Sequence, residues 1–445
     1  MNSILAHGLG GRSDLPVPLW LAAYGAVAAV VMSFLVLGAF WVKPKLKGAS
    51  AGRPLPDAFQ RFVDSRAFRS ALRTLGVLLF TVTVLVAALG PNDSDTNPAP
   101  TWFYVWLWVG LVIVSLLLGP FWRAINPLRA FSAGIRRVAA GGRAPARALP
   151  QRLGYWPAVG GLVVFVWLEL VYVDADKPTT VLAFIVVYSI SHVSLALRYG
   201  QSWFDRGDSF EVYSYLVGSL SLFGRRDDGR LVLRNPLDGL ASVLRAPGLV
   251  AVVCVLLGST AFDGLTRTQL WSNLTRGTMG LENLVLGTLG LAAAIGFVAV
   301  TYVGATRASA RLVHRFKEPE QAANLPQQFA HSLVPIVVGY TLAHYFSLLV
   351  FQGQAGYILA SDPLDLGWNL FGTADWTINF LVVSTEAIAL VQVASIVIGH
   401  IVGVVAAHDR AVGMFLGRDK RRGQYPLIAV MVCYTAIGIT LLVGT

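Results

Sequence analysis

Ten long apolar stretches constrain the fold of this chain more than any other feature. A helix that spans a bilayer needs about 20 consecutive, mostly apolar residues, and stretches of this kind recur along the whole sequence. Charged residues make up only 13% of the chain, against about 25% in a typical soluble domain. The sequence therefore predicts an all-α, polytopic integral membrane bundle of about ten transmembrane helices. The stretches run over Pro18 to Val42, Leu75 to Gly90, Thr101 to Trp122, Gly154 to Val173, Pro178 to Leu197, Pro247 to Leu265, Leu281 to Ala305, Phe329 to Phe351, Trp376 to Ala407 and Pro426 to Gly444.

The basic residues lie almost entirely on one side of this arrangement. Of the 35 lysines and arginines, 31 lie in alternate loops, and none lies within an apolar stretch. The positive-inside rule makes these loops cytoplasmic, and we expect both termini to lie outside. This places residues 1–17 in an outer segment and 18–444 in a transmembrane domain. The predicted cytoplasmic loops are 43–73, 123–152, 198–245, 306–327 and 408–425.

The same distribution explains the net charge of +11. A basic chain invites a nucleic-acid interpretation, but here the charge reports topology, so we expect no nucleic-acid partner. Lysine is rare beside arginine, and Ala, Val, Gly and Leu dominate, which is typical of a GC-rich bacterial gene. We therefore expect a multi-pass protein of the bacterial plasma membrane, with the lipid bilayer as its surroundings.

Ionisable residues inside a membrane are costly and tend to mark function, and the eighth and ninth stretches carry most of them. Asn379, Glu386 and His400 are spaced to form one polar stripe on the ninth helix. His344 lies on the eighth helix, one turn after Tyr340. If the helices meet the outer surface near Phe351 and Trp376, His344 and Glu386 lie about 10 and 15 Å below it. The two side chains can therefore meet.

The fourth and fifth stretches carry a second set of polar residues. Glu169 lies near the outer end of the fourth helix, and Tyr188 and His192 lie one turn apart on the fifth. An outer cavity lined by both sets is geometrically allowed, although nothing in the sequence shows that the sets converge. At the inner end, His331, His400 and His408 come to similar depth.

Two histidines and two glutamates are reasonable ligands for a divalent metal with an open position for water. A bound metal lowers the pKa of that water and yields a nucleophile at neutral pH. On this hypothesis Glu386 and His344 are the catalytic residues, and His344, Glu386, His192 and Glu169 are the metal ligands. The spacing matches no zinc motif, and the alternative is a hydrogen-bonded pair that joins two helices.

The predicted cytoplasmic loops contain two similar segments. Asn126-Pro127-Leu128 is followed by Arg136, and Asn235-Pro236-Leu237 by Arg245. Asn before Pro suits a helix start, so the segments are two similarly capped helices or traces of an internal duplication. Between them, 204–223 is aromatic and predicts an interfacial amphipathic or re-entrant helix. Its carboxylates share one face, either solvated opposite arginines or forming a cation site: Asp205, Asp208 and Glu211.

Three segments resemble bacterial membrane proteins of the fenitrothion hydrolase family. They are the run from Ala6 to Pro16, the Asn-Pro-Leu loop after Gly119-Pro120-Phe121-Trp122, and the stretch from His331 through His344-Tyr345 to Gln352. The resemblance covers the whole chain and implies hydrolysis of an apolar organophosphorus triester with release of a nitrophenol. It brings no catalytic residues with it. The run from Ala6 to Pro16 could fold over the mouth of an outer cavity.

Other functions fit the same residues. In a proton-coupled secondary transporter, Glu386, Glu169 and the histidines would bind protons or substrate, and Pro335 and Gly339 would break the eighth helix. In a redox subunit, His331 or His344 would face His400 or His192 as axial ligands of haem. An accessory subunit that docks a membrane-protein partner through its basic loops is a further alternative.

Overall fold

The computed structural model describes residues 18–140 and 147–443. The described chain divides into two compact units, which are treated separately below. Unit 1 comprises residues 52–234 and 347–382, and unit 2 comprises 18–51, 235–346 and 383–443. The predicted outer segment 1–17, including the Ala6 to Pro16 run, lies outside the described residues.

The described part of the chain contains ten helices that are long and apolar enough to cross a membrane. This agrees with the number predicted from the sequence, and nine of the ten lie close to the predicted stretches. The chain is predominantly helical, as expected for an all-α protein. The helix that does not match its predicted stretch is the ninth, which begins later than predicted.

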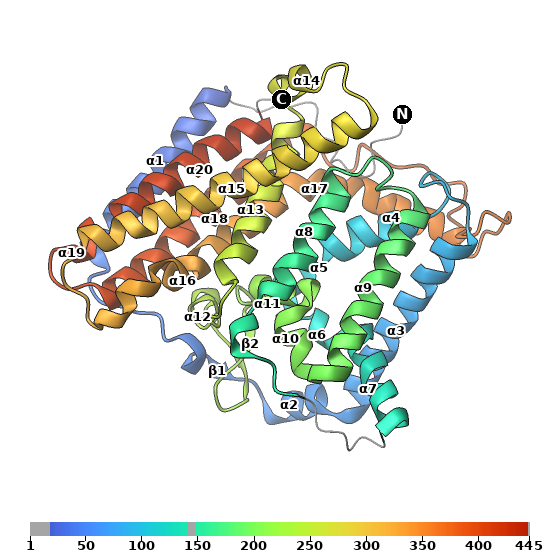
Figure 1. The fold of residues 1–445 in the computed structure, drawn as a ribbon, viewed down its shortest axis with the longest axis horizontal. Helices are drawn as coiled ribbons and strands as arrows, with labels where there is room; N and C mark the ends of the chain where they lie inside the picture. Colours follow the sequence, from blue (N-terminus) through green and yellow to red (C-terminus); the bar gives the residue numbers. More distant parts are fainter. Residues whose placement is uncertain (1–17, 141–146, 444–445) are drawn as a thin grey trace. The chain divides into compact units, whose positions relative to one another are not determined.

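Unit 1 is built from four complete membrane-length helical segments and the C-terminal end of a fifth (Figure 1). Its elements in chain order are β1 (Arg53–Pro54), α2 (Asp57–Asp64), α3 (Arg66–Leu89), α4 (Ala99–Thr101), the π-helix η2 (Trp102–Val109), α5 (Gly110–Leu118), α6 (Trp122–Ile125), α7 (Pro127–Ala140), η3 (Gln151–Leu153), α8 (Trp156–Leu170), α9 (Pro178–Tyr199), η4 (Gln201–Trp203), α10 (Phe204–Gly207), α11 (Ser209–Gly218), β2 (Phe223–Arg225), β3 (Leu231–Leu233), the part of α17 (Val334–Ile358) from residue 347, and η7 (Leu359–Ser361).

The short helix α11 forms the centre of unit 1. It packs against α5, α6 and α8, and nearly all its residues are buried. Phe210 on this helix contacts the rings of Trp108 and Phe165. Of the two alternatives predicted for 204–223, the amphipathic interfacial helix is wrong for this part, because both faces of α11 bury apolar residues, and the re-entrant helix stays a prediction.

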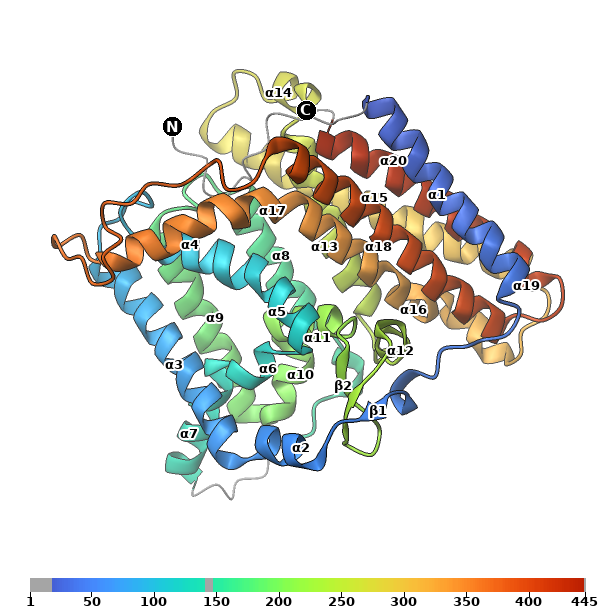
Figure 2. The same ribbon diagram turned by 180° about the vertical axis from the view of Figure 1, so that it is seen from behind.

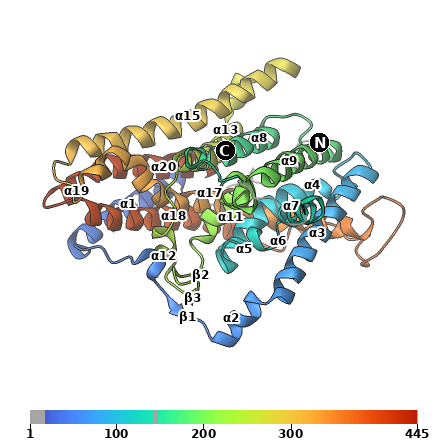
Figure 3. The same cartoon turned by 60° about the horizontal axis from the view of Figure 1, so that its bottom comes forward.

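Two predicted cytoplasmic loops join in a small sheet that the sequence did not predict. Within the described residues, β1, β3 and β2 form a three-stranded antiparallel sheet in that order. Arg53 pairs with Leu233, and Phe223 pairs with the same residue from the other side. Figure 3 shows the three strands beside one another and α2 leading into α3. The strands have two or three residues each, too few for a period-two pattern to be recognised.

Unit 2 holds the remaining long helices (Figure 2). Helices α1, α18 and α20 contact one another, and α15 packs against α13 and α20. Its elements are α1 (Leu19–Phe40), η1 (Gly48–Ser50), α12 (Pro236–Ala241), α13 (Leu249–Thr266), α14 (Gln269–Leu274), α15 (Gly280–Leu312), η5 (Pro319–Asn324), α16 (Leu325–Phe329), η6 (Ala330–Leu333), α17 up to residue 346, α18 (Thr385–Met414), α19 (Asp419–Arg422) and α20 (Tyr425–Val443).

Helices α17 and α18 cross at two glycines. A Cβ atom at Gly399 would lie 2.6 Å from the carbonyl oxygen of Pro335, and one at Gly339 would lie 2.4 Å from that of Ser395. One turn further along α18, a Cβ at Gly403 would meet the carbonyl of Ser332 at 2.7 Å. Small residues four apart allow this backbone approach in membrane helices.

The ninth helix, α18, begins at Thr385 and not at Trp376 as the sequence predicted. The Ser384 hydroxyl accepts a hydrogen bond from the Ala387 amide and caps this start. Upstream, the Gln354 side chain bonds both backbone groups of Asn379, at 2.9 and 3.1 Å. Asn379 therefore lies outside α18, and the predicted polar stripe of Asn379, Glu386 and His400 does not form.

Candidate functional site

An ion triad in unit 2 contains His344, Asp263 of α13 and Arg267, the residue that follows the last turn of α13. Asp263 and Arg267 are four residues apart, so the helix places them on the same face, and Arg267 Nη2 lies 3.5 Å from Asp263 Oδ1. His344 Nε2 on α17 lies 2.5 Å from Asp263 Oδ2 and 3.0 Å from Arg267 Nη2. Asp263 is fully buried and His344 nearly so. The three groups are called the Asp263 triad below.

Arg267 and Asp263 require opposite protonation states of the same atom, His344 Nε2. A guanidinium can only donate, so Arg267 needs a bare, accepting Nε2. An ionised carboxylate can only accept, so Asp263 needs a protonated Nε2. No single protonation state of Nε2 satisfies both partners while Asp263 is ionised. The arrangement can therefore exchange a proton between two states that differ in which partner His344 bonds.

The carboxylate beside His344 is not the one that the sequence predicted. Glu386 lies in the first turn of α18 and is exposed. His344 lies fourteen residues before the end of α17 at Ile358, about 21 Å along the helix. The predicted meeting assumed that α17 ends near Phe351, which placed His344 too near the surface. The sequence signal that points to the triad is the Asp263 and Arg267 spacing at the end of an apolar helix.

A second histidine of unit 2, His400, lies at the crossing of α17 and α18. It is fully buried, its Nδ1 lies 2.9 Å from the Ile396 carbonyl oxygen, and its ring packs edge-on against Tyr340. Its Nε2 has no hydrogen-bond partner among the described residues. The Tyr340 hydroxyl donates to the carbonyl oxygen of Tyr434 at 2.5 Å.

The two histidines at the predicted inner end of unit 2 differ from each other. His331 is buried in η6, and its Nδ1 has no partner within the described chain. His408 is fully engaged, with Nδ1 3.0 Å from Gln424 Oε1 and Nε2 3.0 Å from the carbonyl oxygen of Trp41. His408 therefore joins α18 to Trp41 at the end of α1.

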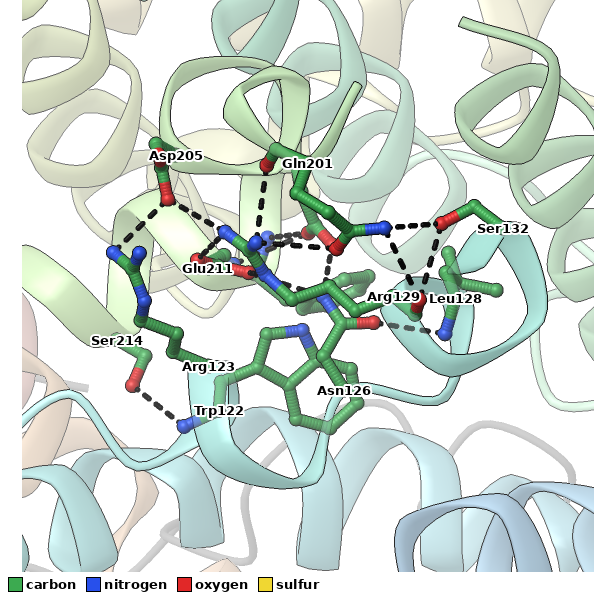
Figure 4. Close-up of polar contacts among 12 residues, drawn as sticks. Trp122, Arg123, Asn126, Leu128, Arg129, Ser132, Gln201, Asp205, Glu211 and Ser214 are labelled. Atoms are coloured by element: carbon green, nitrogen blue, oxygen red, sulfur yellow. Dashed lines mark hydrogen bonds and ion pairs between the residues drawn. The ribbon is translucent and has the colours of Figure 1, made fainter. Parts of the chain in front are cut away.

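Unit 1 contains a larger buried polar cluster around Arg129 (Figure 4). The Arg129 guanidinium donates through Nε to Glu211 Oε2 at 2.8 Å and through Nη2 to Glu211 Oε1 at 2.5 Å. Nη2 also lies 2.6 Å from Asp205 Oδ1, which pairs with Arg123 at 2.9 Å. The remaining nitrogen, Nη1, donates to the carbonyl oxygen of Gln201 at 3.0 Å. Every nitrogen of this guanidinium has a partner.

The Asn126 amide joins this cluster to the start of α11. Its nitrogen donates to Asp208 at 2.8 Å and to Glu211 at 3.1 Å, while its oxygen accepts from the Leu128 amide. Asp208 in turn caps α11 and accepts from the Tyr188 hydroxyl at 2.9 Å. The predicted cap role of Asn126 is confirmed, and so is that of Asn235, whose oxygen accepts from the Leu237 amide. The acidic face opposite arginines is also confirmed, but Asp208 and Glu211 are buried instead of solvated.

Burial and pairing act in opposite directions on the charges of this cluster. Burial raises the pKa of Glu211, although the hydrogen bonds from Arg129 oppose the rise. Burial alone would lower the pKa of Arg129, but the bonds to Glu211 and Asp205 raise it above its ordinary value. A bidentate guanidinium–carboxylate pair of this kind is a strong hydrogen-bonded unit. Its completeness indicates a structural role.

The four predicted metal ligands do not form one site. His192 Nδ1 accepts a hydrogen bond from Trp203 Nε1 at 3.0 Å, and the His192 ring packs on Tyr188. His192 lies fourteen residues, about 21 Å, from the start of α9 at Pro178, whereas Glu169 is one residue from the end of α8 at Leu170. These two belong to unit 1, and His344 and Glu386 to unit 2. Among the described residues, no group of three or more His, Cys, Asp or Glu is arranged to hold a metal.

Comparisons with protein-family models, with curated proteins and with solved structures found no match. The resemblance to the fenitrothion hydrolase family therefore stays a prediction from the sequence.

Proposed function

We propose that this chain is a proton-coupled secondary transporter of the bacterial plasma membrane, with the Asp263 triad as its proton-binding site. The proposed topology has both termini outside. The distribution of basic residues supports it, with 31 of 35 in the five predicted cytoplasmic loops.

A single observation carries the proposal, namely that His344 Nε2 lies within hydrogen-bond distance of both Asp263 and Arg267. When Nε2 is protonated, His344 donates a hydrogen bond to Asp263 and cannot accept one from Arg267. When Nε2 is bare, His344 accepts a hydrogen bond from Arg267 and no longer donates one to Asp263. Because these states favour different positions of α17 relative to α13, proton binding is coupled to a shift between the two helices.

Two further features of unit 2 support a proton-coupled carrier. His400 offers a bare or protonated Nε2 inside the same bundle, next to the Tyr340 ring. The chain leading into α17 is interrupted, because the 3-10 turn η6 separates α16 from α17 and Pro335 follows at once. Interrupted helices beside buried ionisable groups are typical of transporter binding regions.

Proton binding can be measured without knowing the solute. Infrared difference spectra of the purified chain between acid and alkaline pH should contain a carboxyl band from Asp263. We expect Asp263→Asn to remove this band and His344→Asn to shift it. Asp238→Asn is the matched control, because the Asp238 carboxylate bonds the Lys47 amide and is not part of the triad. Identical spectra for the wild type and Asp263→Asn would refute the proposed proton site.

Coupling is tested in proteoliposomes that contain a pH-sensitive dye. A panel of apolar and anionic solutes is added outside under an imposed pH gradient. We expect at least one solute to dissipate the gradient in wild-type vesicles and not in Asp263→Asn vesicles. Equal dissipation by both proteins would show that the triad does not couple proton and solute movement.

A membrane-embedded hydrolase of apolar, organophosphorus-type substrates is the second candidate, and the pairing of His344 with a buried carboxylate favours it. A histidine oriented by a carboxylate can act as a general base on water. In this version His344 and Asp263 replace the predicted Glu386 and His344 pair, and no step needs a metal. Release of nitrophenol from fenitrothion by purified chain, abolished in His344→Asn and unchanged by a chelator, would support it. No release by the wild type would remove it.

A further inference from the structure

Two arginines and a buried histidine come together at the inner end of unit 2, away from the Asp263 triad. Arg245 follows α12, Arg410 lies near the end of α18, and His331 lies in η6, which contacts both of these helices. The charges of Arg245 and Arg410 act on each other and on His331. This basic cluster lies on the side that the sequence predicts to be cytoplasmic.

Within the described chain, neither of these guanidiniums pairs with a carboxylate. Arg410 makes one long hydrogen bond, of 3.4 Å, to the Ala241 carbonyl oxygen, and Arg245 bonds the Gln328 side chain. The adjacent carboxylate, Asp409, is turned to the other side, where it accepts from the Trp41 indole and the Lys45 amide at 2.9 and 2.6 Å. The contrast is with Arg129 in unit 1, which holds two carboxylates.

A buried polar atom supplies an independent observation at the same place. His331 is 3% exposed, and its Nδ1 finds no hydrogen-bond partner among the described residues. Buried polar atoms are nearly always hydrogen-bonded in native proteins, so each exception needs an explanation. A bound group beside the two arginines would explain both the unpartnered nitrogen and the uncompensated charge.

We propose that Arg245, Arg410 and His331 form a binding site for a phosphate group. Guanidinium groups bind phosphate oxygens through parallel N–H donors, which makes arginine the preferred residue for phosphate recognition. Two positive charges that repel each other while lacking carboxylate partners are stabilised when an anion binds between them. The phosphate belongs either to the headgroup of an anionic phospholipid of the inner leaflet or to a free phosphate compound.

Calorimetric titration of the delipidated full-length chain in a non-ionic detergent tests the site. The two probes are inorganic phosphate and a short-chain phosphatidylglycerol below its micelle concentration. We expect at least one probe to bind, and its affinity to fall about tenfold or more in Arg245→Gln and in Arg410→Gln, because a charge-assisted hydrogen bond is lost. The matched control is Arg311→Gln, an exposed arginine near the inner end of α15.

The outcomes separate the sources and can overturn the site. Tighter binding of phosphatidylglycerol than of phosphate identifies a lipid headgroup, and the reverse identifies a free phosphate compound. Failure of both probes to bind the wild type overturns the proposal, as does an equal loss in Arg311→Gln. Arg245 is exposed, so Arg245→Gln keeps the test decisive if Arg410→Gln does not fold. The Asp263→Asn variant should bind the probe normally, which separates this site from the proposed proton coupling.

Discussion

The Arg129 cluster of unit 1 and the Asp263 triad of unit 2 both combine an arginine with a buried carboxylate, but in different ways. In unit 1, Arg129 meets two carboxylates, and every nitrogen of its guanidinium has an acceptor. In unit 2, Arg267 and Asp263 both face the same nitrogen of His344. The first arrangement is satisfied in one protonation state, and the second is not.

This difference separates a structural cluster from a candidate functional one. A fully paired buried network fixes the elements that it joins, and loss of one partner leaves an uncompensated charge. A buried group whose partners compete can change its bonds when a proton arrives or leaves. We therefore expect variants in unit 1 to change mainly the stability, and variants of the triad to change mainly proton binding.

The largest effect is expected for Arg129→Gln. The substitution leaves Glu211 and Asp205 without their shared cation, and breaking a buried ion pair in this way costs about 3–5 kcal/mol of unfolding free energy. Equilibrium unfolding in mixed micelles measures the loss. Arg123→Gln is the control, because the Arg123 side chain is 60% exposed and surface ion pairs contribute at most about 1 kcal/mol. Similar losses in both variants would contradict a structural role for the buried pair.

A smaller effect is expected at the crossing of α17 and α18 in unit 2, which depends on backbone contact instead of charge. In Gly399→Ala the new Cβ would lie 2.6 Å from the Pro335 carbonyl oxygen, and overpacking of this kind costs about 1–3 kcal/mol. Gly304→Ala on α15 is the matched control, since no atom lies within 4 Å of its added Cβ. The same unfolding assay applies to both variants. An unchanged unfolding free energy in Gly399→Ala would show that α17 and α18 can move apart there at no cost.

Asp263→Asn should reduce stability by only about 1 kcal/mol, the net value of one hydrogen bond, because it also removes the conflict at His344 Nε2. The variant should nevertheless lose the pH-dependent infrared signal. A stability loss as large as that of Arg129→Gln, with the infrared signal intact, would place the triad in the same structural class as the unit 1 cluster.

The sequence predicted the long helices well, because about 20 apolar residues in a row leave few alternatives. It misplaced the start of α18, because the segment from Trp376 to Val383 is as apolar as a membrane-spanning helix. The features that keep this segment out of the helix are the Ser384 cap and the hydrogen bonds from Gln354 to Asn379. That error placed Glu386 well inside the ninth helix, whereas it lies in the first turn of α18. His344, a predicted site residue, lies in the Asp263 triad, but its partner depends on the contact of α13 with α17, which no spacing in the sequence reveals.

The smallest expected effect concerns an ion pair outside both clusters. Asp64 at the end of α2 lies 2.5 Å from Arg225 and 2.5 Å from Arg69, and the hydrogen bond from Arg225 is the main cause that lowers the pKa of Asp64 below 3.8. A lowered folded-state pKa adds stability above the unfolded value and loses it as the pH falls through the folded value. Wild type should therefore exceed Asp64→Asn by at most about 1 kcal/mol at neutral pH, and the difference should vanish as the pH falls below 3.8. Unfolding curves of both proteins between neutral and acid pH measure it. A difference that persists at the acid end would mean that Asp64 stabilises α2 by packing and not by charge. Partly exposed carboxylates of unit 1, like the buried ones, would then contribute to the stability of the fold without being ionised.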